Sequence, residues 1–312
     1  MATRRLTPTR ARWIATVGMT AAVCWTSTAQ AGVVLSNPKL YSYKMPGPTS
    51  YVSAGPDGNM YVAAGRSVVK MSPRGAVLAT YALPAAVDQM TPLGSSLYLT
   101  YAAGTVLAAL PTSGGPITTV DAGLALSVGA LTTGPDGNLW EGALGLIFRA
   151  QPDGQLVEYS SPETPNAPNS INAIKSAYGK LWYTNPSTNK IGTITTTGYL
   201  TEYGPLAAAP HGIAFAPNNS LYFTEPSQGI VGRITTGGAI TQWRTNIPAP
   251  TDVVTGPDGN EWITGTQTVA RFSPAGRITF FKGGGNNAGI AVGSDNASIW
   301  FATGQSTVDV LR

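Results

Sequence analysis

Short apolar runs alternate along most of the chain with turns that contain glycine, proline or asparagine. Residues 211–215 form one such run, 216–219 read Ala-Pro-Asn-Asn, and 221–224 are aromatic and β-branched. Two more runs, 230–234 and 239–243, follow and are separated by Thr-Thr-Gly-Gly. Runs of this length and composition are typical of β-strands. The pattern therefore predicts a meander of four antiparallel strands.

The meander recurs with a period near 40 residues. An aromatic residue marks the same place in every copy, and successive markers lie 37 to 42 residues apart. In three copies Gly-Pro-Asp-Gly precedes the marker; proline sets φ for a turn, aspartate caps it, and glycine adopts positive φ. A fixed period of this size indicates a repeat architecture. The markers are Tyr61, Tyr98, Trp140, Trp182, Tyr222, Trp262 and Trp300.

Four-stranded repeats stacked around an axis form a β-propeller. The sequence predicts an all-β, seven-bladed β-propeller of four-stranded antiparallel blades. The seventh copy ends with its third strand, residues 308–311. Residues 40–43 supply a fourth strand, because Tyr43 precedes Tyr81, the end of the next outer strand, by 38 residues. We expect this N-terminal strand to close the ring and so remove an open sheet edge.

Two recurrent features have both a structural and a functional interpretation. The tryptophans among the markers lie inside predicted strands, which favours packing between blades over a surface for stacking ligands. The aspartates at 57, 136 and 258 lack the alternating carboxylates of a calcium loop. We therefore interpret them as turn caps.

The first 31 residues have the features of a secretory signal peptide. Four arginines precede the apolar stretch 13–25, and Ala-Gln-Ala at 29–31 has the small residues of a cleavage site. We expect cleavage after Ala31, a secreted or periplasmic location, and one propeller domain over residues 32–312. The apolar stretch is too short for a spanning helix, so no transmembrane segment is expected. The Pro-rich stretch 161–168 is interpreted as a long loop between blades.

Removal of this segment changes the charge balance. The chain has 19 Lys and Arg against 15 Asp and Glu, but the first 31 residues hold four arginines and no acidic residue. The mature chain would carry 15 residues of each sign, which argues against nucleic acid as a partner. The one cysteine, Cys24, lies in the same segment. Disulfides, thiolate metal sites and a cysteine nucleophile are therefore excluded from the mature chain, which we expect to be a monomer.

The repeated phrases resemble those of the virginiamycin B lyase family over all seven repeats. The resemblance implies a seven-bladed propeller and a carbon–oxygen lyase that opens streptogramin B-type cyclic depsipeptides by elimination, without ester hydrolysis, using Mg2+. The phrases are turn and packing motifs, and they are more specific for the fold than for the reaction. The best copies are residues 134–140, 190–194, 200–203, 210–213 and 221–225.

The resemblance also implies where functional residues lie, at the starts of the innermost strands. The family has a Pro-His pair, which Pro-His at 210–211 matches, and a later Glu-Pro-His. Here the following blades read Pro-Thr at 250–251 and Asn-Ala at 287–288. The last blade reads Trp-Phe-Ala-Thr at 300–303, without the glutamate that helps to hold magnesium in the family. The glutamate and second histidine are therefore missing, and a non-catalytic ligand- or protein-binding propeller of the cell envelope is the alternative function.

His211, the only histidine, begins an inner strand, and Glu225 ends the strand after it. In an antiparallel hairpin the start of one strand faces the end of the next. A carboxylate beside an imidazole supports general base action, so His211 and Glu225 are the candidate catalytic residues. The alternative is a solvated rim histidine beside a surface glutamate.

The same two places in other blades provide candidate ligand-binding residues around the mouth of the channel. A small-molecule or peptide ligand is the expected partner there. Asp88 would add a carboxylate for magnesium or be a solvated loop residue, and no residue set has the spacing of a metal site. A polar pocket around His211 would favour the lyase, and a flat face with an apolar patch would favour the binding propeller. The candidates at the position of His211 are Ser50, Asp88, Asn172 and Thr251, and Gly129 and Ala288 occupy this position in the two remaining blades. The candidates at the position of Glu225 are Tyr101 and Asn185.

Overall fold

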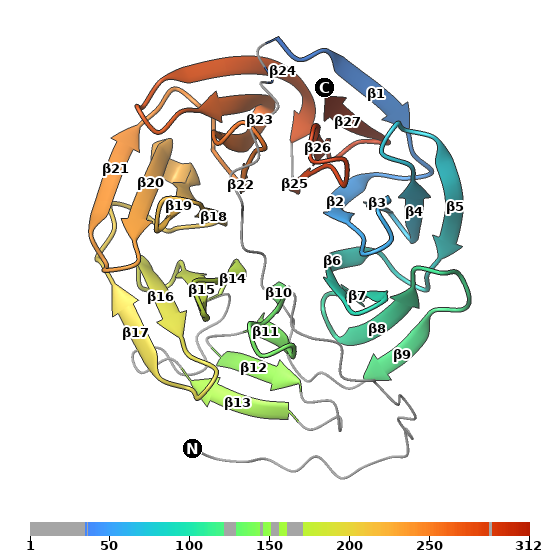
Figure 1. Ribbon diagram of the computed structural model, residues 1–312, viewed down its shortest axis with the longest axis horizontal. Coiled ribbons are helices and arrows are strands. Elements are labelled where there is room, and N and C mark those ends of the chain that lie inside the picture. Colours follow the sequence, from blue (N-terminus) through green and yellow to red (C-terminus); the bar gives the residue numbers. More distant parts are fainter. Residues whose placement is uncertain are drawn as a thin grey trace.

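Seven small antiparallel sheets form a ring around one axis (Figure 1). The structure is a computed structural model that describes residues 35, 37–121, 129–143, 146–150, 156–160, 171–286 and 289–312. Within these residues the one helical element is the short 3-10 turn η1 (Pro226–Gln228). The predicted all-β propeller is therefore confirmed. The predicted signal peptide, the loop 161–168 and the rim position 288 lie outside the described residues.

In blades 1 to 5 four strands follow one another in chain order from the axis outwards. Blade 1 contains β2 (Thr49–Ala54), β3 (Met60–Ala64), β4 (Ser67–Met71) and β5 (Val77–Ala82). Blade 2 contains β6 (Val87–Leu93), β7 (Ser96–Tyr101), β8 (Val106–Pro111) and β9 (Thr118–Asp121). Blade 3 contains β10 (Ala130–Thr133), β11 (Leu139–Ala143), β12 (Leu146–Ala150) and β13 (Leu156–Ser160). Blade 4 contains β14 (Ile174–Ala177), β15 (Lys180–Asn185), β16 (Lys190–Ile194) and β17 (Leu200–Tyr203). Blade 5 contains β18 (Ile213–Ala216), β19 (Ser220–Glu225), β20 (Ile230–Thr235) and β21 (Ile240–Arg244).

Blade 6 consists of β22 (Val253–Thr255), the long β23 (Glu261–Phe272) and β24 (Ile278–Asn286). The first half of β23 pairs with β22 and its second half with β24. Between the halves, Gln267 has a left-handed φ of 53°. The Arg271 guanidinium lies over the Trp262 ring, 5.8 Å from its centroid, so the halves lie side by side. They take the second and third strand positions of a four-stranded blade.

Blade 7 joins the two ends of the ring. Its strands are β25 (Ile290–Val292), β26 (Ile299–Ala302), β27 (Thr307–Leu311) and β1 (Leu40–Lys44). β1 pairs antiparallel with β27, with Leu40 opposite Leu311 and Tyr43 opposite Val308. This confirms the predicted closure, in which residues 40–43 complete the last blade beside residues 308–311.

The closing strand also supplies an aromatic ring, as the outer strands of other blades do. Tyr43 stacks on Trp300 with ring centroids 6.2 Å apart. In blade 3, Tyr159 of the outer strand stacks on Trp140 at 5.4 Å. Such pairs contribute roughly 0.5–1.5 kcal/mol beyond the burial of apolar area. β1 therefore stabilises blade 7 through its side chains as well as its backbone.

The hydrophobic core is divided among the seams between neighbouring blades. Trp300 of blade 7 packs with Met60 and Val69 of blade 1. Trp182 of blade 4 packs with Leu221 of blade 5 in the same way. This confirms that the tryptophans pack between blades. The markers Tyr61, Trp140, Trp182, Tyr222, Trp262 and Trp300 are at most 1% exposed.

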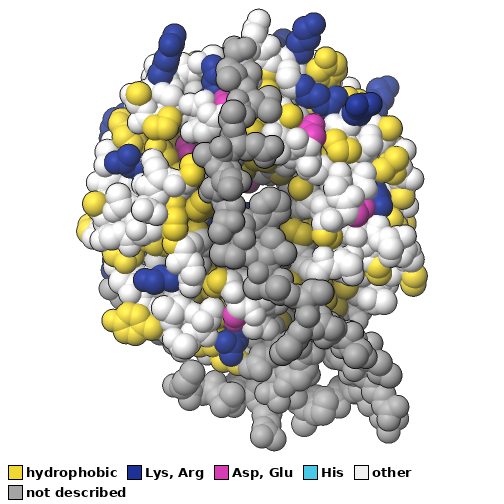
Figure 2. All heavy atoms as spheres, in the orientation of Figure 1, with side chains coloured by type: hydrophobic (Ala, Val, Ile, Leu, Met, Phe, Trp, Pro, Cys, Tyr) yellow, Lys and Arg dark blue, Asp and Glu magenta, His cyan; other side chains and the backbone are white. Residues whose placement is uncertain are grey.

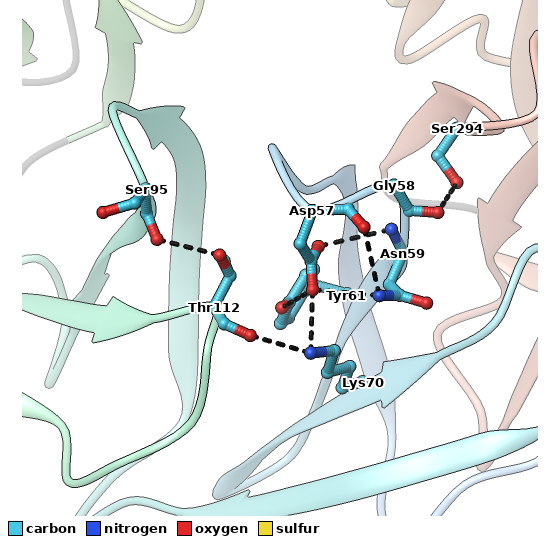
Figure 3. Close-up of polar contacts among 8 residues, drawn as sticks. All are labelled: Asp57, Gly58, Asn59, Tyr61, Lys70, Ser95, Thr112 and Ser294. Carbon is cyan, nitrogen blue, oxygen red and sulfur yellow. Dashed lines mark hydrogen bonds and ion pairs between the residues drawn. The ribbon is translucent and has the colours of Figure 1, made fainter.

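The Gly-Pro-Asp-Gly turns hold the marker residues in place (Figure 3). In blade 1 the Asp57 carboxylate accepts hydrogen bonds from the Asn59 backbone N–H (3.3 Å) and from the Tyr61 hydroxyl (3.0 Å). The Lys70 amine lies 2.7 Å from the same carboxylate. Asp57 therefore acts as a turn cap, as expected from the sequence.

The same turn ties blade 1 to both of its neighbours (Figure 3). Lys70 donates a hydrogen bond to the carbonyl of Thr112 in blade 2, at 2.8 Å. From blade 7, the Ser294 hydroxyl donates to the carbonyl of Gly58, at 2.7 Å. The repeated tetrapeptide thus connects blades as well as reversing the chain.

Gly75 lies in the turn of blade 1 that the closing strand covers. Its φ of 94° is left-handed, and a Cβ atom there would lie 2.1 Å from Cζ of Tyr43. We expect Gly75→Ala to reduce the free energy of unfolding by about 2–4 kcal/mol, because backbone strain adds to the displacement of the ring. In the control Gly58→Ala, φ is 76° but no atom lies within 4 Å of the added Cβ, so only the strain applies. Denaturant unfolding measures both losses, and equal losses would contradict this role of Tyr43.

Candidate functional site

A cavity of about 90 Å3 lies on the axis of the ring. Every blade contributes a residue to its wall, which identifies the cavity as the central channel of the propeller. Asn172, Lys175 and His211 also line it. The residues that represent the seven blades are Tyr51, Gln89, Ala130, Ala173, Gly212, Asp252 and Gly289.

The strand registers show that these seven residues occupy equivalent positions. Gly212 precedes Ile213, which is opposite Phe223 in blade 5. Asp252 precedes Val253, which is opposite Ile263 in blade 6. The rim position predicted from the sequence lies one residue earlier in every blade. The registers support the alignment of His211 with Ser50, Asp88, Gly129, Asn172 and Thr251.

The predicted rim residues have different surroundings. His211 and Asn172 line the cavity. The Ser50 hydroxyl donates to the carbonyl of Val87 at 3.0 Å, and the Thr251 hydroxyl donates to that of Ala249 at 3.0 Å. These two hydroxyls are therefore engaged with neighbouring backbone.

Asp88 is held by its own blade. Its carboxylate accepts a hydrogen bond from the backbone N–H of Gly104 at 2.7 Å. Burial raises the pKa of Asp88, although this hydrogen bond acts in the opposite direction. Asp88 is not among the residues that line the cavity.

The residues predicted from the ends of the second strands lie inside the blades. Tyr101 is 8% exposed and packs in the seam between blades 1 and 2. Asn185 is fully buried; its amide donates to Glu202 at 3.1 Å and accepts from the backbone N–H of Thr188 at 3.3 Å. Neither residue lines the central cavity.

Glu225 is fully buried at the end of β19, and both of its oxygens are bonded. One accepts a hydrogen bond from the backbone N–H of Ala208 at 2.6 Å, and the other accepts from the Gln242 amide. The structure therefore does not direct this carboxylate to His211. The Glu225 carboxylate instead holds, through Ala208, the segment that leads into the rim of blade 5.

The His211 ring is oriented by the neighbouring blade. Its Nδ1 lies 3.1 Å from the carbonyl oxygen of Thr251, which also accepts from the Thr224 hydroxyl at 2.7 Å. A carbonyl oxygen only accepts hydrogen bonds, so Nδ1 must carry the proton. The lone pair is then on Nε2, which is the form that a general base requires.

Asp252 and Lys175 are functional candidates that the sequence analysis missed. Both line the cavity, and the Asp252 carboxylate is in electrostatic contact with His211. A Cβ atom on Gly212 would lie 3.0 Å from Oδ1 of Asp252, so the glycine leaves room for this carboxylate. Lys175 is in electrostatic contact with Asp252 and hydrogen-bonds Tyr51. Applying the strand alternation one residue beyond the rim position would have identified Asp252 and Tyr51.

The surroundings in the cavity shift the pKa values of Asp252 and Lys175. Burial raises the pKa of Asp252, although the positive charge of Lys175 and backbone hydrogen bonds from Val253 and Ile290 oppose the shift. The pKa of Lys175 is raised by Tyr51 and by Asp252, against the effect of burial. Lys175 is therefore a stable ammonium group in the channel.

These residues do not fit the magnesium ion that the resemblance implies. In the part of the chain that the structure describes, no group of three or more His, Cys, Asp or Glu residues is placed to hold a metal. Among the described residues, Asp252 is the one carboxylate that lines the cavity, and its oxygens accept from the backbone N–H groups of Val253 (2.9 Å) and Ile290 (3.4 Å). Mg2+ prefers several oxygen ligands, and the Lys175 ammonium beside this carboxylate would repel it.

The surface around the ring has no concentration of one charge on the face shown. Lys and Arg side chains are spread around the edge in Figure 2, with Asp and Glu among them. Several exposed large apolar side chains lie on outer strands, at Leu40, Tyr41, Val77, Leu78 and Phe280. The cavity at His211 has the polar side chains of Asn172, Lys175 and Asp252 beside apolar ones such as Leu131 and Ile174. The exposed apolar side chains on the outer strands lie away from it.

Comparisons with known proteins agree with this architecture. The family model described as "Virginiamycin B lyase family" matches residues 117–308. A search of curated proteins found no match.

The described residues contain no helix long and apolar enough to cross a membrane.

Three solved structures with similar folds have titles that name streptogramin B lyase or virginiamycin B lyase. "Streptogramin B lyase structure" has a TM-score of 0.76 at 24% identity and covers 88% of this chain and 97% of its own. Selenomethionine-substituted virginiamycin B lyase from Staphylococcus aureus has a TM-score of 0.76 at 24% identity, with 88% and 99% covered. A catalytically inactive histidine-to-alanine variant of the Staphylococcus aureus enzyme with quinupristin has a TM-score of 0.76 at 23% identity, with 88% and 99% covered. These likenesses show the shared fold.

Glu225 makes a pH-dependent contribution to stability. Burial raises its pKa above the usual 4.5, although the hydrogen bonds from Gln242 and Ala208 oppose the shift. The folded protein then keeps this proton to a higher pH than the unfolded chain, so the stability that Glu225 confers falls as the pH rises above about 4.5. Glu225→Gln removes this titration. Denaturant unfolding at several pH values should show the wild type losing stability relative to the variant as the pH rises; a constant difference would contradict it.

Proposed function

Because the chain belongs to the virginiamycin B lyase family, we propose that it is a carbon–oxygen lyase that acts at the mouth of its central channel. The proposed substrates are streptogramin B-type cyclic depsipeptides, which it opens by elimination. The observation that carries the proposal is the hydrogen bond between His211 Nδ1 and the carbonyl of Thr251, at 3.1 Å. It leaves Nε2 as a base at the cavity that Asn172, Lys175 and Asp252 also line.

His211 Nε2 takes the proton from the carbon next to a carbonyl group of the substrate. The electron pair of that C–H bond forms a carbon–carbon double bond. The bond between the neighbouring carbon and the ester oxygen breaks, and the ester leaves as a carboxylate. No water is consumed, and the ring opens. The Asp252 carboxylate, in electrostatic contact with His211, stabilises the imidazolium that forms.

The size of the cavity limits how a substrate binds. About 90 Å3 admits a functional group and a few water molecules, but it does not admit a macrocycle. The ring of the substrate would therefore lie across the mouth, with the reacting carbon presented to His211. Asn172, which also lines the cavity, is placed to contact it.

We also propose that the protein is exported and acts as a monomer outside the cytoplasm. The support is the sequence of residues 1–31, with its arginines, apolar stretch and Ala-Gln-Ala. A lyase in this location would meet depsipeptides before they entered the cell.

A second candidate function is a non-catalytic ligand- or protein-binding propeller of the cell envelope. It is favoured by the blades after His211, which read Pro-Thr at 250–251 and Asn-Ala at 287–288 and so lack the Glu-Pro-His that the resemblance implies in a later blade. The Thr251 hydroxyl is bonded to the carbonyl of Ala249. Glu225, with both oxygens bonded inside blade 5, supports the same alternative. Rigid propellers present loops from all blades to one face, which suits recognition.

Incubation of the protein with a streptogramin B depsipeptide distinguishes the two functions. Elimination only redistributes atoms, so the open product has the mass of the substrate, whereas hydrolysis adds one water. We expect a product of unchanged mass by mass spectrometry, and a loss of roughly 100-fold to 10,000-fold in rate for His211→Ala.

The control is Lys282→Met, since Lys282 is exposed on the outer strand β24 and should not affect the rate. Full activity of His211→Ala would remove His211 from the reaction. Saturable binding of the depsipeptide without any product would favour the binding propeller.

A further inference from the structure

Lys175 is a departure from the internal repeat. It lies opposite Trp182, the marker of blade 4. The equivalent residues of the other blades, also opposite their markers, are small or uncharged. They are Ser53, Thr91, Thr132, Ala214, Val254 and Ala291. The propeller fold therefore does not require a charge at this position.

The Lys175 amine is positioned from across the channel. β14, the first strand of blade 4, and β2 of blade 1 lie on opposite sides of the axis in Figure 1. Lys175 on β14 hydrogen-bonds Tyr51 on β2. The pair therefore spans the channel and fixes one positive charge inside the cavity that His211 lines.

Asp252, the acidic group in electrostatic contact with Lys175, does not form a direct ion pair with it. Asp252 accepts backbone hydrogen bonds from Val253 at 2.9 Å and from Ile290 at 3.4 Å. Its contact with Lys175 is electrostatic, and none of the ion pairs found among the described residues includes Lys175. The Lys175 ammonium can therefore bind an anionic oxygen that enters the cavity.

Such an oxygen arises in the proposed reaction. When His211 removes a proton next to a carbonyl, negative charge develops on the carbonyl oxygen before the carbon–oxygen bond breaks. A fixed cation in a partly enclosed cavity stabilises this charge more strongly than one in water. The elimination then needs no reactant besides the substrate. The proton goes to His211, and the electron pair of the broken carbon–oxygen bond leaves with the carboxylate.

We infer that Lys175, held by Tyr51, binds the carbonyl oxygen of the substrate and stabilises its developing negative charge, so that this chain needs no divalent cation. The inference rests on the proposed lyase function, and it assigns the channel as a binding site for a small oxyanion. It also explains why the residues present do not fit magnesium.

Acetate is the probe for the oxyanion site, because it is small enough for the cavity. His211 is the only histidine, so its ring NMR signals report events in the cavity without overlap. We expect acetate to shift these signals saturably in the wild type. In Lys175→Met the affinity should fall at least about tenfold, since a charge-assisted hydrogen bond is lost. The control Lys282→Met removes an exposed lysine and should bind acetate as the wild type does.

The outcomes separate this inference from the proposed function. No saturable shift in the wild type, or equal binding by Lys175→Met, would overturn the oxyanion site whatever the activity. Acetate binding that depends on Lys175, without turnover of a depsipeptide, would support the site and remove the lyase.

If turnover is found, we expect it to persist in EDTA and to fall at least about 100-fold in Lys175→Met. Lys175→Arg, which keeps the charge, should restore part of the rate. Turnover that requires added magnesium, or that Lys175→Met leaves unchanged, would overturn the inference while leaving the lyase function intact.

Discussion

The pairing of β1 with β27 is the constraint on which the rest of the structure depends. It joins residues from the two ends of the described chain in one sheet, with Leu40 opposite Leu311. The stack of Tyr43 on Trp300 adds the aromatic contact that outer strands make in other blades. A closed ring has no free sheet edge, and it fixes the distance from every inner strand to the axis. The geometry of the cavity therefore depends on the pairing of β1 with β27 at the periphery of the molecule.

The channel shows how a repeat protein can acquire a specific site. The repeat supplies seven equivalent positions around one axis, and most are occupied by small or uncharged residues such as Ala130, Gly212 and Gly289. Charged or basic side chains occur where single blades depart from the pattern, at Lys175, His211 and Asp252. These residues come from blades 4, 5 and 6, which are neighbours in the ring. Their proximity follows from the fold, but their identities do not.

The sequence predicted the fold well because its signals are local. Turn chemistry in the Gly-Pro-Asp-Gly segments and the spacing of the aromatic markers are enough to count blades and to find the closing strand. The alignment of rim positions agrees with the strand registers for the same reason. Side-chain direction was harder to predict. Thr224 and Glu225 are adjacent on β19, yet the Thr224 hydroxyl bonds the carbonyl of Thr251 while the Glu225 carboxylate bonds Ala208 inside the blade. The contact of Lys175 with Tyr51 across the channel joins blades that are far apart in the repeat, and no local pattern reports it.

The central claim is that the closed ring presents His211 to the channel with Nε2 free to act as a base. Because the chain has one histidine, a nitrogen-15 correlation spectrum at a pH where the imidazole is neutral identifies its tautomer directly. The account predicts that Nδ1 carries the proton, as its bond to the carbonyl of Thr251 requires. A spectrum in which Nε2 carries the proton would contradict it.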